Sequence, residues 1–398
     1  MVSPRARSTI LRRFTGRVAD ELAILCRPAG GSPDAGQQAE DAYGELAAIL
    51  ASDRATFRHL AGETLFFRDI QRDLPLVLAA RARVLANIGQ SESASALYPT
   101  AIQQAPLDQG TAFELAAAAV LPHERDAWSV RDIPAAPSCG CEGCTRSGAR
   151  ILRLGEQTSL HTTNLYGTGS TAFAQASNMF DAAERLLNQY GMGFRDVVRT
   201  WIHLRDIDRD YDALNRARRA FFQRCGIEQR PASTGVQGGP YPRAHDVSMH
   251  LHAVKSASGL EITRMSTPTL NEAWNYGADF SRGLRIAELN KTALYISGTA
   301  SIDETGQTAH PGNFAAQVDR MLHNLASLLT QQGASFENLV SGVAYLKHPS
   351  DASVFRSLIQ ERGFAGFPCA LVEAPLCRPE LLCEAEVLAM LPLATAGA

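Results

Sequence analysis

Apolar and polar positions recur along the chain with the spacing of alternating helices and strands. In the last third, apolar residues follow each other every three or four positions, as on the buried face of a helix, at Val318, Leu322, Leu325, Leu328 and Leu329. A helix with the same spacing is expected upstream, at Met179, Ala183, Leu186 and Leu187. Each predicted helix is followed by an alternating or continuously apolar run, typical of a half-buried or central strand. The pattern predicts a chain of the α+β class.

A fixed distance repeats three times within this pattern. A glutamine early in a helix precedes a basic residue at the end of the next strand by 30 positions, in the pairs Gln38 and Arg68, Gln175 and Arg205, and Gln317 and Lys347. The final strands also align, because Glu114 and Glu384 each precede a proline by eight positions, while His250–Val254 takes that place in the middle. We therefore predict three tandem copies of one α+β unit. The alternative is three unrelated amphipathic units.

Length and composition suggest where these units end. A chain of 398 residues is too long for one hydrophobic core, and two turn-rich or polar stretches interrupt it, at Pro134–Gly148 and Ser256–Gly277. We expect a degenerate N-terminal unit, a cysteine-containing linker, a central unit, a connection and a C-terminal unit, at residues 1–130, 131–150, 151–256, 257–279 and 280–398.

Charge and hydropathy exclude some functions. The formal net charge of −3 gives no attraction to nucleic acid or to an anionic membrane. No apolar run reaches the roughly 18 to 20 residues that a membrane span requires. Several of the eight cysteines lie in apolar strand-like contexts, including Cys369 and Cys383, which favours reduced thiols over disulfides. We expect a cytoplasmic protein with no nucleic-acid or membrane partner.

One cysteine cluster has metal-ligand character. Cys139, Cys141 and Cys144 lie within six residues, and His123 is a possible fourth zinc ligand. A structural zinc site normally pairs two such clusters, and the sequence contains one. The sequence also contains no glycine-rich phosphate loop, HExxH motif or G-x-S-x-G motif. A reduced linker is favoured, and no metal or cofactor is expected.

Three segments of the C-terminal unit resemble one known group of enzymes. Leu376–Glu384 reads L-C-R-P-E-L-L-C-E, Tyr276–Arg282 contains Y-G followed by F-S-R, and Leu294–Ile302 contains S-G-T-A-S-I. In this order they resemble the chorismatase branch of the Rid family. Gly283 replaces the usual alanine, and Cys369 stands where Rid imine deaminases carry the arginine that binds the substrate carboxylate.

The resemblance implies both an architecture and a reaction. Rid subunits, with their chorismate-mutase-like fold, form trimers, so three Rid-like units in one chain would make a covalent pseudo-trimer with helices outside and sheets inside. The implied substrate is a small anionic cyclic dicarboxylate, chorismate or a relative, whose enol-pyruvyl ether is cleaved without a cofactor in secondary or aromatic metabolism. The chain would act as a monomeric pseudo-trimer or as a homo-oligomer.

Such a substrate requires cationic residues and a proton donor. We expect Arg282 and Arg378 to bind its carboxylates, with Lys347 as a third cation, because the planar guanidinium pairs with both carboxylate oxygens. Glu384 lies inside an apolar strand, where burial raises a carboxyl pKa toward that of a general acid. Glu386 falls on the same face of that strand and is expected to support it. Surface solvation or a structural ion pair is the alternative for the three cations, and a structural carboxylate that accepts from backbone amides is the alternative for Glu384.

Smaller polar groups complete the predicted site. Cys377 precedes Arg378 and is the second catalytic candidate after Glu384. In the resembling family a cysteine here accompanies the subtype that forms a hydroxybenzoate, although a buried cysteine is more often a small hydrophobe. Hydrogen bonds to substrate hydroxyls are expected from side chains that core packing would explain equally well, namely Tyr276, Tyr345, Ser297 and Thr299.

Three functions remain open from the sequence. The first is a chorismatase-like hydrolase or lyase. The second is another Rid-type enzyme, either an imine or enamine deaminase or a biosynthetic tailoring enzyme with a changed substrate. The third is a non-enzymatic protein that binds a small acid.

Overall fold

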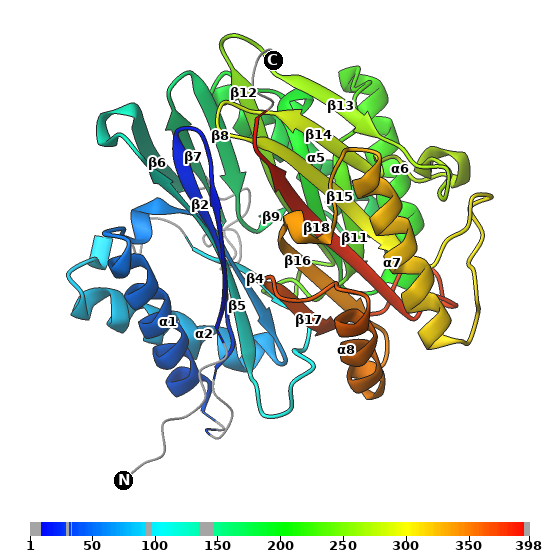
Figure 1. The fold of residues 1–398 in the computed structure, drawn as a ribbon, viewed down its shortest axis with the longest axis horizontal. Coiled ribbons are helices and arrows are strands. Elements are labelled where there is room, and N and C mark those ends of the chain that lie inside the picture. Colours follow the sequence, from blue (N-terminus) through cyan, green and yellow to red (C-terminus); the bar gives the residue numbers. More distant parts are fainter. Residues whose placement is uncertain (1–8, 29–31, 33, 93–97, 135–146, 394–398) are drawn as a thin grey trace.

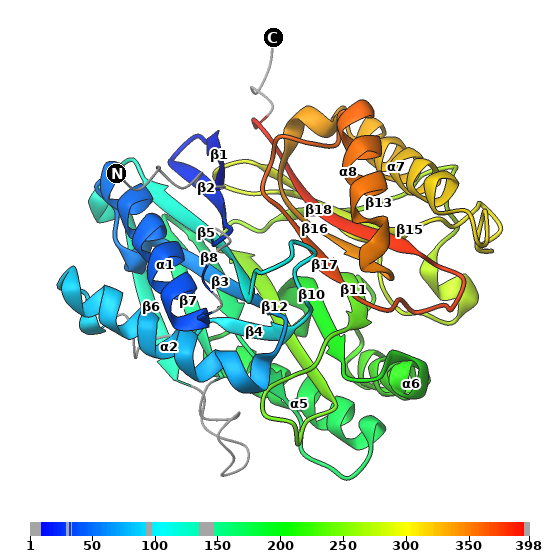
Figure 2. The ribbon, with the colours of Figure 1, turned by 90° about the horizontal axis from the view of Figure 1, so that it is seen from below.

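Three β-sheets form the inside of the protein, and helices cover the outside. The computed structural model describes residues 9–28, 32, 34–92, 98–134 and 147–393. Six α-helices in this part of the chain lie in three pairs around the sheets, which Figure 1 and the perpendicular view of Figure 2 both show. The predicted α+β architecture with helices outside and sheets inside is confirmed.

The first sheet contains five strands in the order β1-β2-β5-β3-β4. Their bounds are β1 Ile10–Thr15, β2 Ala19–Cys26, β3 Leu60–Phe67, β4 Thr100–Gln103 and β5 Phe113–Pro122. The helices are α1, Ala35–Ser52, and α2, Ile70–Asn87. Each begins at an aspartate, Asp34 or Asp69, whose carboxylate accepts from a backbone N–H of the first turn.

The second sheet contains seven strands, six of them in the order β11-β10-β12-β8-β7-β6, with β9 paired to β12. The strands are β6 Trp128–Pro134, β7 Gly148–Leu154, β8 Gln157–Thr162, β9 Leu165–Tyr166, β10 Val197–Leu204, β11 Ala232–Gln237 and β12 Val247–Ser256. The helices are α5, Ala172–Gln189, and α6, Ile207–Cys225.

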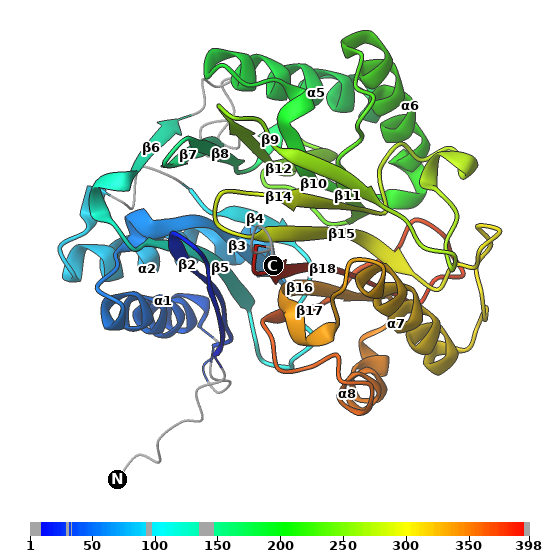
Figure 3. The same cartoon turned by 45° about the horizontal axis from the view of Figure 1, so that its top comes forward.

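The third sheet contains six strands in the order β13-β14-β15-β18-β16-β17. The strands are β13 Glu261–Met265, β14 Gly283–Ala287, β15 Thr292–Ala300, β16 Leu339–Leu346, β17 Cys369–Glu373 and β18 Cys383–Leu391. The helices are α7, Phe314–Thr330, and α8, Ala352–Glu361. Figure 3 shows the three helix pairs on three different sides of the molecule.

One strand order is common to all three sheets. Without β6, β9 and β13, the orders are β1-β2-β5-β3-β4, β7-β8-β12-β10-β11 and β14-β15-β18-β16-β17. In each, the last two strands pair in parallel and the others antiparallel. Each also has an irregularity at the start of the strand that follows the first helix, after Leu60, Val197 or Leu339. Shared order and shared bulges show that one unit occurs three times.

The three glutamines of the repeat hold the same loop in each unit. Each side-chain oxygen accepts from the backbone N–H of a residue at or beside the start of the last strand, at 2.9 Å for Gln38, 2.8 Å for Gln175 and 2.8 Å for Gln317. Each amide nitrogen donates to carbonyls of nearby loops. The glutamine is therefore a buried connection between helix and sheet.

The basic residues of the repeat donate to backbone carbonyls in the loop that precedes the last strand of each unit. Arg205 Nη2 donates to the Pro240 carbonyl at 2.9 Å, and Lys347 Nζ donates to the Pro379 carbonyl at 2.6 Å. Arg68 donates likewise to the carbonyl of Pro106. The 30-residue spacing thus reflects how the unit folds, and Lys347, predicted as a substrate-binding cation, also makes a structural contact.

Two strands lie where the sequence suggested connecting segments. Residues 131–150 include the end of β6 and the start of β7, which pair with each other and extend the second sheet. Residues 257–279 include β13, which extends the third sheet. Both β6 and β13 are edge strands with exposed positions, so their polar composition resembles that of a loop.

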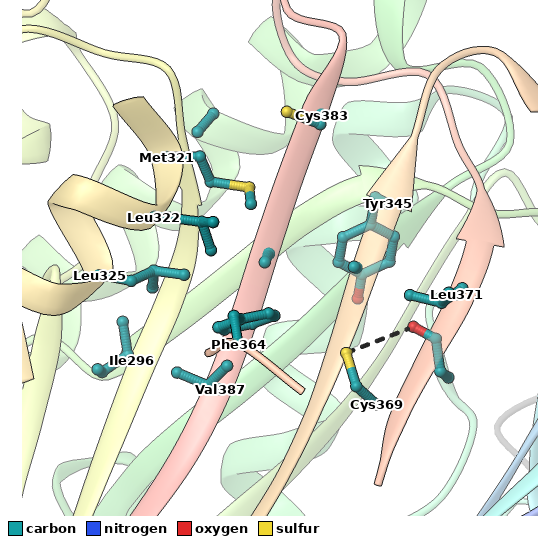
Figure 4. Packing of buried hydrophobic residues seen from close by; sticks show 14 of the residues in the cluster. Ile296, Met321, Leu322, Leu325, Tyr345, Phe364, Cys369, Leu371, Cys383 and Val387 are labelled. Carbon is teal, nitrogen blue, oxygen red and sulfur yellow. Dashed lines mark hydrogen bonds between the residues drawn. The ribbon is translucent and has the colours of Figure 1, made fainter. Parts of the chain in front are cut away.

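The packing of each unit follows the predicted helix spacing. In the third unit, Met321, Leu322 and Leu325 of α7 face Ile296 of β15 and Val387 of β18 (Figure 4). No helix in the described ranges is long and apolar enough to cross a membrane. The cysteines Cys139, Cys141 and Cys144 lie outside the described residues.

Candidate active site

Several of the predicted site residues, Glu384 and Ser297 among them, lie where the second and third sheets meet. The edge strand β11 lies against β15, so that the Ser233 N–H donates to Ser297 Oγ at 2.9 Å and the Gly298 N–H donates to Thr234 Oγ1 at 2.9 Å. Ser297 Oγ in turn donates to the Ser281 carbonyl. Ser297 therefore fastens the two sheets together.

Glu384 lies buried at this junction, in β18 and opposite Tyr345 of β16. Burial raises the pKa of the Glu384 carboxyl to about 8, the charge of Glu386 adds to the rise, and Arg282 and Arg199 oppose it. A side chain at Gly298 would place its Cβ 1.9 Å from Glu384 Oε1. The glycine thus provides the space that the carboxyl occupies.

Glu386 is held by the second sheet. Arg199 Nη2 donates to Glu386 Oε2 at 2.7 Å, and Trp201 Nε1 donates to Glu386 Oε1 at 2.7 Å. Arg199 also donates to Thr234 Oγ1 at 2.6 Å. Glu386 thus lies beside Glu384, as strand alternation predicts, and receives hydrogen bonds from the second sheet. At Glu384, by contrast, the charges of Arg282 and Arg199 offset the effect of burial only in part.

Arg282 and Arg378, which are predicted to bind the substrate carboxylates, both donate to backbone carbonyls in neighbouring loops. Arg282 Nε donates to the Asn271 carbonyl at 2.9 Å, and Arg378 Nη1 donates to the Gly306 carbonyl at 2.8 Å. Asn271 and Gly306 are neighbours, because a Cβ at Gly306 would lie 2.4 Å from Asn271 Nδ2. Arg282 is buried and Arg378 is half-buried.

Two guanidinium groups lie close to the ring of Phe280. Arg282 stands 5.7 Å and Arg218 5.6 Å from the centre of its ring. Arg218 belongs to α6 and donates to Asn215 Oδ1 at 2.6 Å and to Ser233 Oγ at 3.4 Å. The second unit therefore contributes a cation to this region.

Cys377 lies among the same groups. Its thiol is affected by the charges of Glu384, Arg378 and Arg282 and by a hydrogen bond with Tyr211. Burial raises the pKa of the Cys377 thiol to about 12, so the thiol stays protonated and is a weak nucleophile. Cys377 fits a role in shaping the site better than one in covalent catalysis.

Three further residues are predicted to contact the substrate. Tyr345 is buried and its hydroxyl is hydrogen-bonded to Glu386. Thr299 is buried and donates to the Ser297 carbonyl at 2.9 Å, a local bond within its own strand. Tyr276 lies in a short 3-10 helix, Ala273–Tyr276, and its side chain is outside the described residues.

A surface cavity of about 240 Å³ lies beside this cluster. It is lined by Tyr211 and Asn215 of α6 and by Gly277 and Ala278 of the following unit, among others. Tyr211 contacts Cys377, and Asn215 contacts Arg218, so the cavity adjoins the buried groups. The cavity thus lies on the surface next to the groups of the site, and its lining does not include Glu384, Arg282 or Arg378.

The sequence analysis missed the second unit's contribution. Arg199 interrupts an otherwise largely apolar strand, as Glu384 does, and this pattern was a usable signal. Thr234, Tyr211 and Arg218 carry no such signal, because polar residues are ordinary on an edge strand or a helix. Only the packing of β11 on β15 brings them to the site.

At the position of Glu384, the first unit also has a glutamate, Glu114, whereas the second unit has a serine, Ser248. Glu114 pairs with Phe66 and Ser248 pairs with His203, in the register that joins Glu384 to Tyr345. Glu114 is buried and bonded to Arg27 Nε at 3.2 Å, and Arg27 also donates to the Cys369 carbonyl. Among the described residues, no cluster of three metal-ligating side chains occurs.

Comparisons with known proteins support the resemblance seen in the motifs. Residues 275–391 match the family described as Endoribonuclease L-PSP, the Rid family. The chain is 24% identical over 223 residues to a chorismatase of Streptomyces rapamycinicus, covering 49% of this chain and 64% of that protein, which is less than two thirds of its length.

Solved structures are similar as well. A chorismatase crystal structure superposes with a TM-score of 0.59 at 14% identity, covering 83% of this chain and 93% of that one. RidA from an Antarctic Psychrobacter covers 32% of this chain and 99% of its own, with a TM-score of 0.27 and 19% identity. The resemblance to the Rid fold and its chorismatase branch is confirmed by the family match, the curated chorismatase and the chorismatase structure.

Proposed function

We propose that this protein is a chorismatase-like enzyme that cleaves the enol-pyruvyl ether of chorismate or of a related cyclic dicarboxylate. One observation carries the proposal: a buried carboxyl, Glu384, lies near two arginines, Arg282 and Arg199, at the junction of two units. Similarity to a chorismatase in sequence and in fold supports the same class of reaction.

Glu384 has the properties of a general acid. With a pKa of about 8, its carboxyl carries a proton in most molecules at neutral pH. In the proposed reaction this proton passes to the enol-pyruvyl ether, a carbon–oxygen bond of the ether breaks, and the three-carbon part leaves as pyruvate. Loss of pyruvate with addition of water would give a dihydroxy-diene acid, and loss without water would give a hydroxybenzoate.

Arginines provide the binding groups for an anionic substrate. Arg282 and Arg378 are the proposed carboxylate ligands. Arg218 is a further cation in this region, because its guanidinium lies 5.6 Å and that of Arg282 lies 5.7 Å from the Phe280 ring centre. Charge-assisted pairs between guanidinium and carboxylate are short and strong, which favours a diacid over a neutral ring. Cys377 would contact the ring as a neutral side chain.

A direct assay tests the proposal. The full chain is incubated with chorismate, pyruvate is measured by its reduction with lactate dehydrogenase and NADH, and the ultraviolet spectrum is followed for the ring product. Pyruvate release that depends on Glu384 is the expected result. Absence of pyruvate from chorismate and from its close isomers, with folded protein, would reject the assignment.

The Rid-type deaminase is a weaker alternative. Cys369 occupies the position of the carboxylate-binding arginine, and its carbonyl accepts from Arg27, which is bonded to Glu114. Ammonia release from 2-iminobutanoate, generated in situ, distinguishes this function from the proposed one. A shift in melting temperature with chorismate but no product would favour the binding protein.

A further inference from the structure

A second cavity, apart from Glu384, lies where the three sheets meet. Its volume is about 290 Å³, and strands of all three units line it, including β5, β10, β12 and β18. Glu384 is not among the lining residues, whereas Glu386 and Arg199 are. The Arg199–Glu386 pair therefore lines this cavity and also lies near the Glu384 carboxyl.

Small side chains of the first unit create the space. Ala116 and Ala118 of β5 line the cavity and correspond in strand position to His250 and His252 of β12 and to Glu386 and Leu388 of β18. Ala118 is exposed although β5 is the central strand of its sheet. Two alanines thus leave room where the other units place larger side chains.

The second unit provides a wall of parallel rings. The ring of Trp201 lies 4.6 Å from that of His250 at an angle of 8°, and the ring of His203 lies 5.6 Å from that of His250 at 9°. These residues come from the adjacent strands β10 and β12. Rings stacked on one another in this way leave their edges and outer faces for contact with another planar ring.

Several buried polar atoms of the lining residues have no hydrogen-bond partner within the described part of the chain. They are Arg199 Nη1, His203 Nδ1, His250 Nδ1, His252 Nε2 and Glu288 Oε1. Arg199 and His203 are each only 2% exposed. A buried polar atom without a partner is unfavourable, so a bound molecule with matching groups would be stabilised here.

The charges around the cavity disfavour an anion. Arg199 is paired with Glu386, and Lys291 is paired with Glu21 at 2.6 Å and Glu288 at 3.0 Å. Burial lowers the pKa of His203 and of His252 to about 3, so both imidazoles are neutral. An anion would find no uncompensated positive charge among these groups, in contrast to the arginines near Glu384.

We propose that this central cavity binds a neutral, single-ring aromatic or heteroaromatic compound that carries hydrogen-bonding groups. Its ring packs against the stacked rings of Trp201, His250 and His203 and contacts the alanines of β5. Its polar groups bond to the unpartnered nitrogens of the histidines and Arg199. The site is separate from the proposed catalytic one and does not depend on the reaction assigned there.

Titration by fluorine-19 nuclear magnetic resonance tests this site, with 4-fluorophenol as the neutral probe and 4-fluorobenzoate as the matched anion. We expect saturable binding of the phenol and at least tenfold weaker binding of the benzoate. Ala118→Phe fills the cavity and should abolish phenol binding, while Ala257→Phe adds the same ring in an exposed turn and should leave it unchanged.

His250→Phe provides a second measurement that does not depend on a filled cavity. It keeps a planar ring in the wall but removes the imidazole nitrogens, so phenol affinity should fall at least threefold while circular dichroism stays unchanged. The proposal is overturned if millimolar phenol does not bind, if benzoate binds equally well, or if a folded Ala118→Phe variant retains the affinity. If Ala118→Phe does not fold, unchanged affinity in His250→Phe overturns it.

Discussion

At the scale of single residues, the environment of two glutamates in one strand separates their roles. Glu386 receives hydrogen bonds from Arg199 and Trp201, whereas burial and the neighbouring charge of Glu386 raise the pKa of Glu384 to about 8. The raised pKa suits a proton donor and the paired carboxylate suits a fixed charge. The assignment of Glu384 as the acid rests on this difference.

Replacement of Glu384 tests its role as the acid. Glu384→Gln keeps the shape but removes the proton donor, so turnover of chorismate should fall by roughly 10²- to 10⁴-fold. The wild-type rate should decline as pH rises through about 8, where the carboxyl ionises. Rates of pyruvate release over pH 5 to 10 measure both effects. Glu380→Gln, an exposed change four residues earlier, is the control, and a near-normal rate in Glu384→Gln would make Glu384 structural.

Arginine replacements test substrate binding. Each charge-assisted bond contributes about 1.5 to 3 kcal/mol, so Arg378→Ala or Arg282→Ala should raise the KM for the substrate roughly 10- to 100-fold. Lysine at either position should restore only part of the affinity, since it lacks the planar fork. Initial-rate kinetics measure this. A variant with an altered kcat and an unchanged KM would argue against carboxylate binding at that position.

At the scale of elements, the repeated glutamine explains why each unit closes in the same way. Gln317 is fully buried, accepts from the Leu382 N–H and donates to the carbonyls of His310 and Glu380. These bonds fix the loop that leads into β18 and thereby position Glu384. Gln317, which the sequence revealed through its spacing from Lys347, thus supports the site indirectly.

The loss of this glutamine should destabilise the third unit. Gln317→Leu leaves buried backbone groups without partners, and each such group costs about 1 to 3 kcal/mol. We expect a lower free energy of unfolding in urea, measured by circular dichroism. Gln331→Leu, at the exposed end of the same helix, is the matched control and should change stability by less than about 0.5 kcal/mol. Equal stability of the two variants would contradict the structural role of Gln317.

At the scale of the whole molecule, buried carboxyls at unit junctions couple stability to pH. Burial raises the pKa of Glu384 from 4.5 to about 8 and that of Glu114 from 4.5 to about 7. Below pH 4.5 these groups are protonated in both states. As pH rises, these carboxyls ionise first in the unfolded chain, so the free energy of unfolding falls. It stops falling once the pH passes the pKa of the folded protein.

The protein should therefore lose stability between about pH 4.5 and 8. Glu384→Gln removes one of these groups, so its stability relative to wild type should increase from pH 5 to pH 8.5, with each pKa unit equivalent to about 1.4 kcal/mol. Urea unfolding at several pH values measures the difference. A stability difference that does not change with pH would mean that Glu384 is ionised in the folded protein at neutral pH.

Much of the fold could be predicted from the sequence because the repeat is encoded locally. Helix periodicity, strand alternation and the spacing from Gln38 to Arg68 and its counterparts all lie within single units. The extra strands β6 and β13 could not be predicted in the same way. They are polar edge strands whose pairing depends on a neighbouring strand and not on their own composition.

The sequence by itself determined the three units, the buried Glu384 and the motif that surrounds Arg378, because these depend on local pattern and composition. Only the tertiary structure decided that β11 lies against β15, which brings Thr234 and Arg199 of the second unit to Glu384 of the third. It also decided that Lys347 binds a loop carbonyl. Contacts between units join residues far apart in the chain, so no local pattern encodes them.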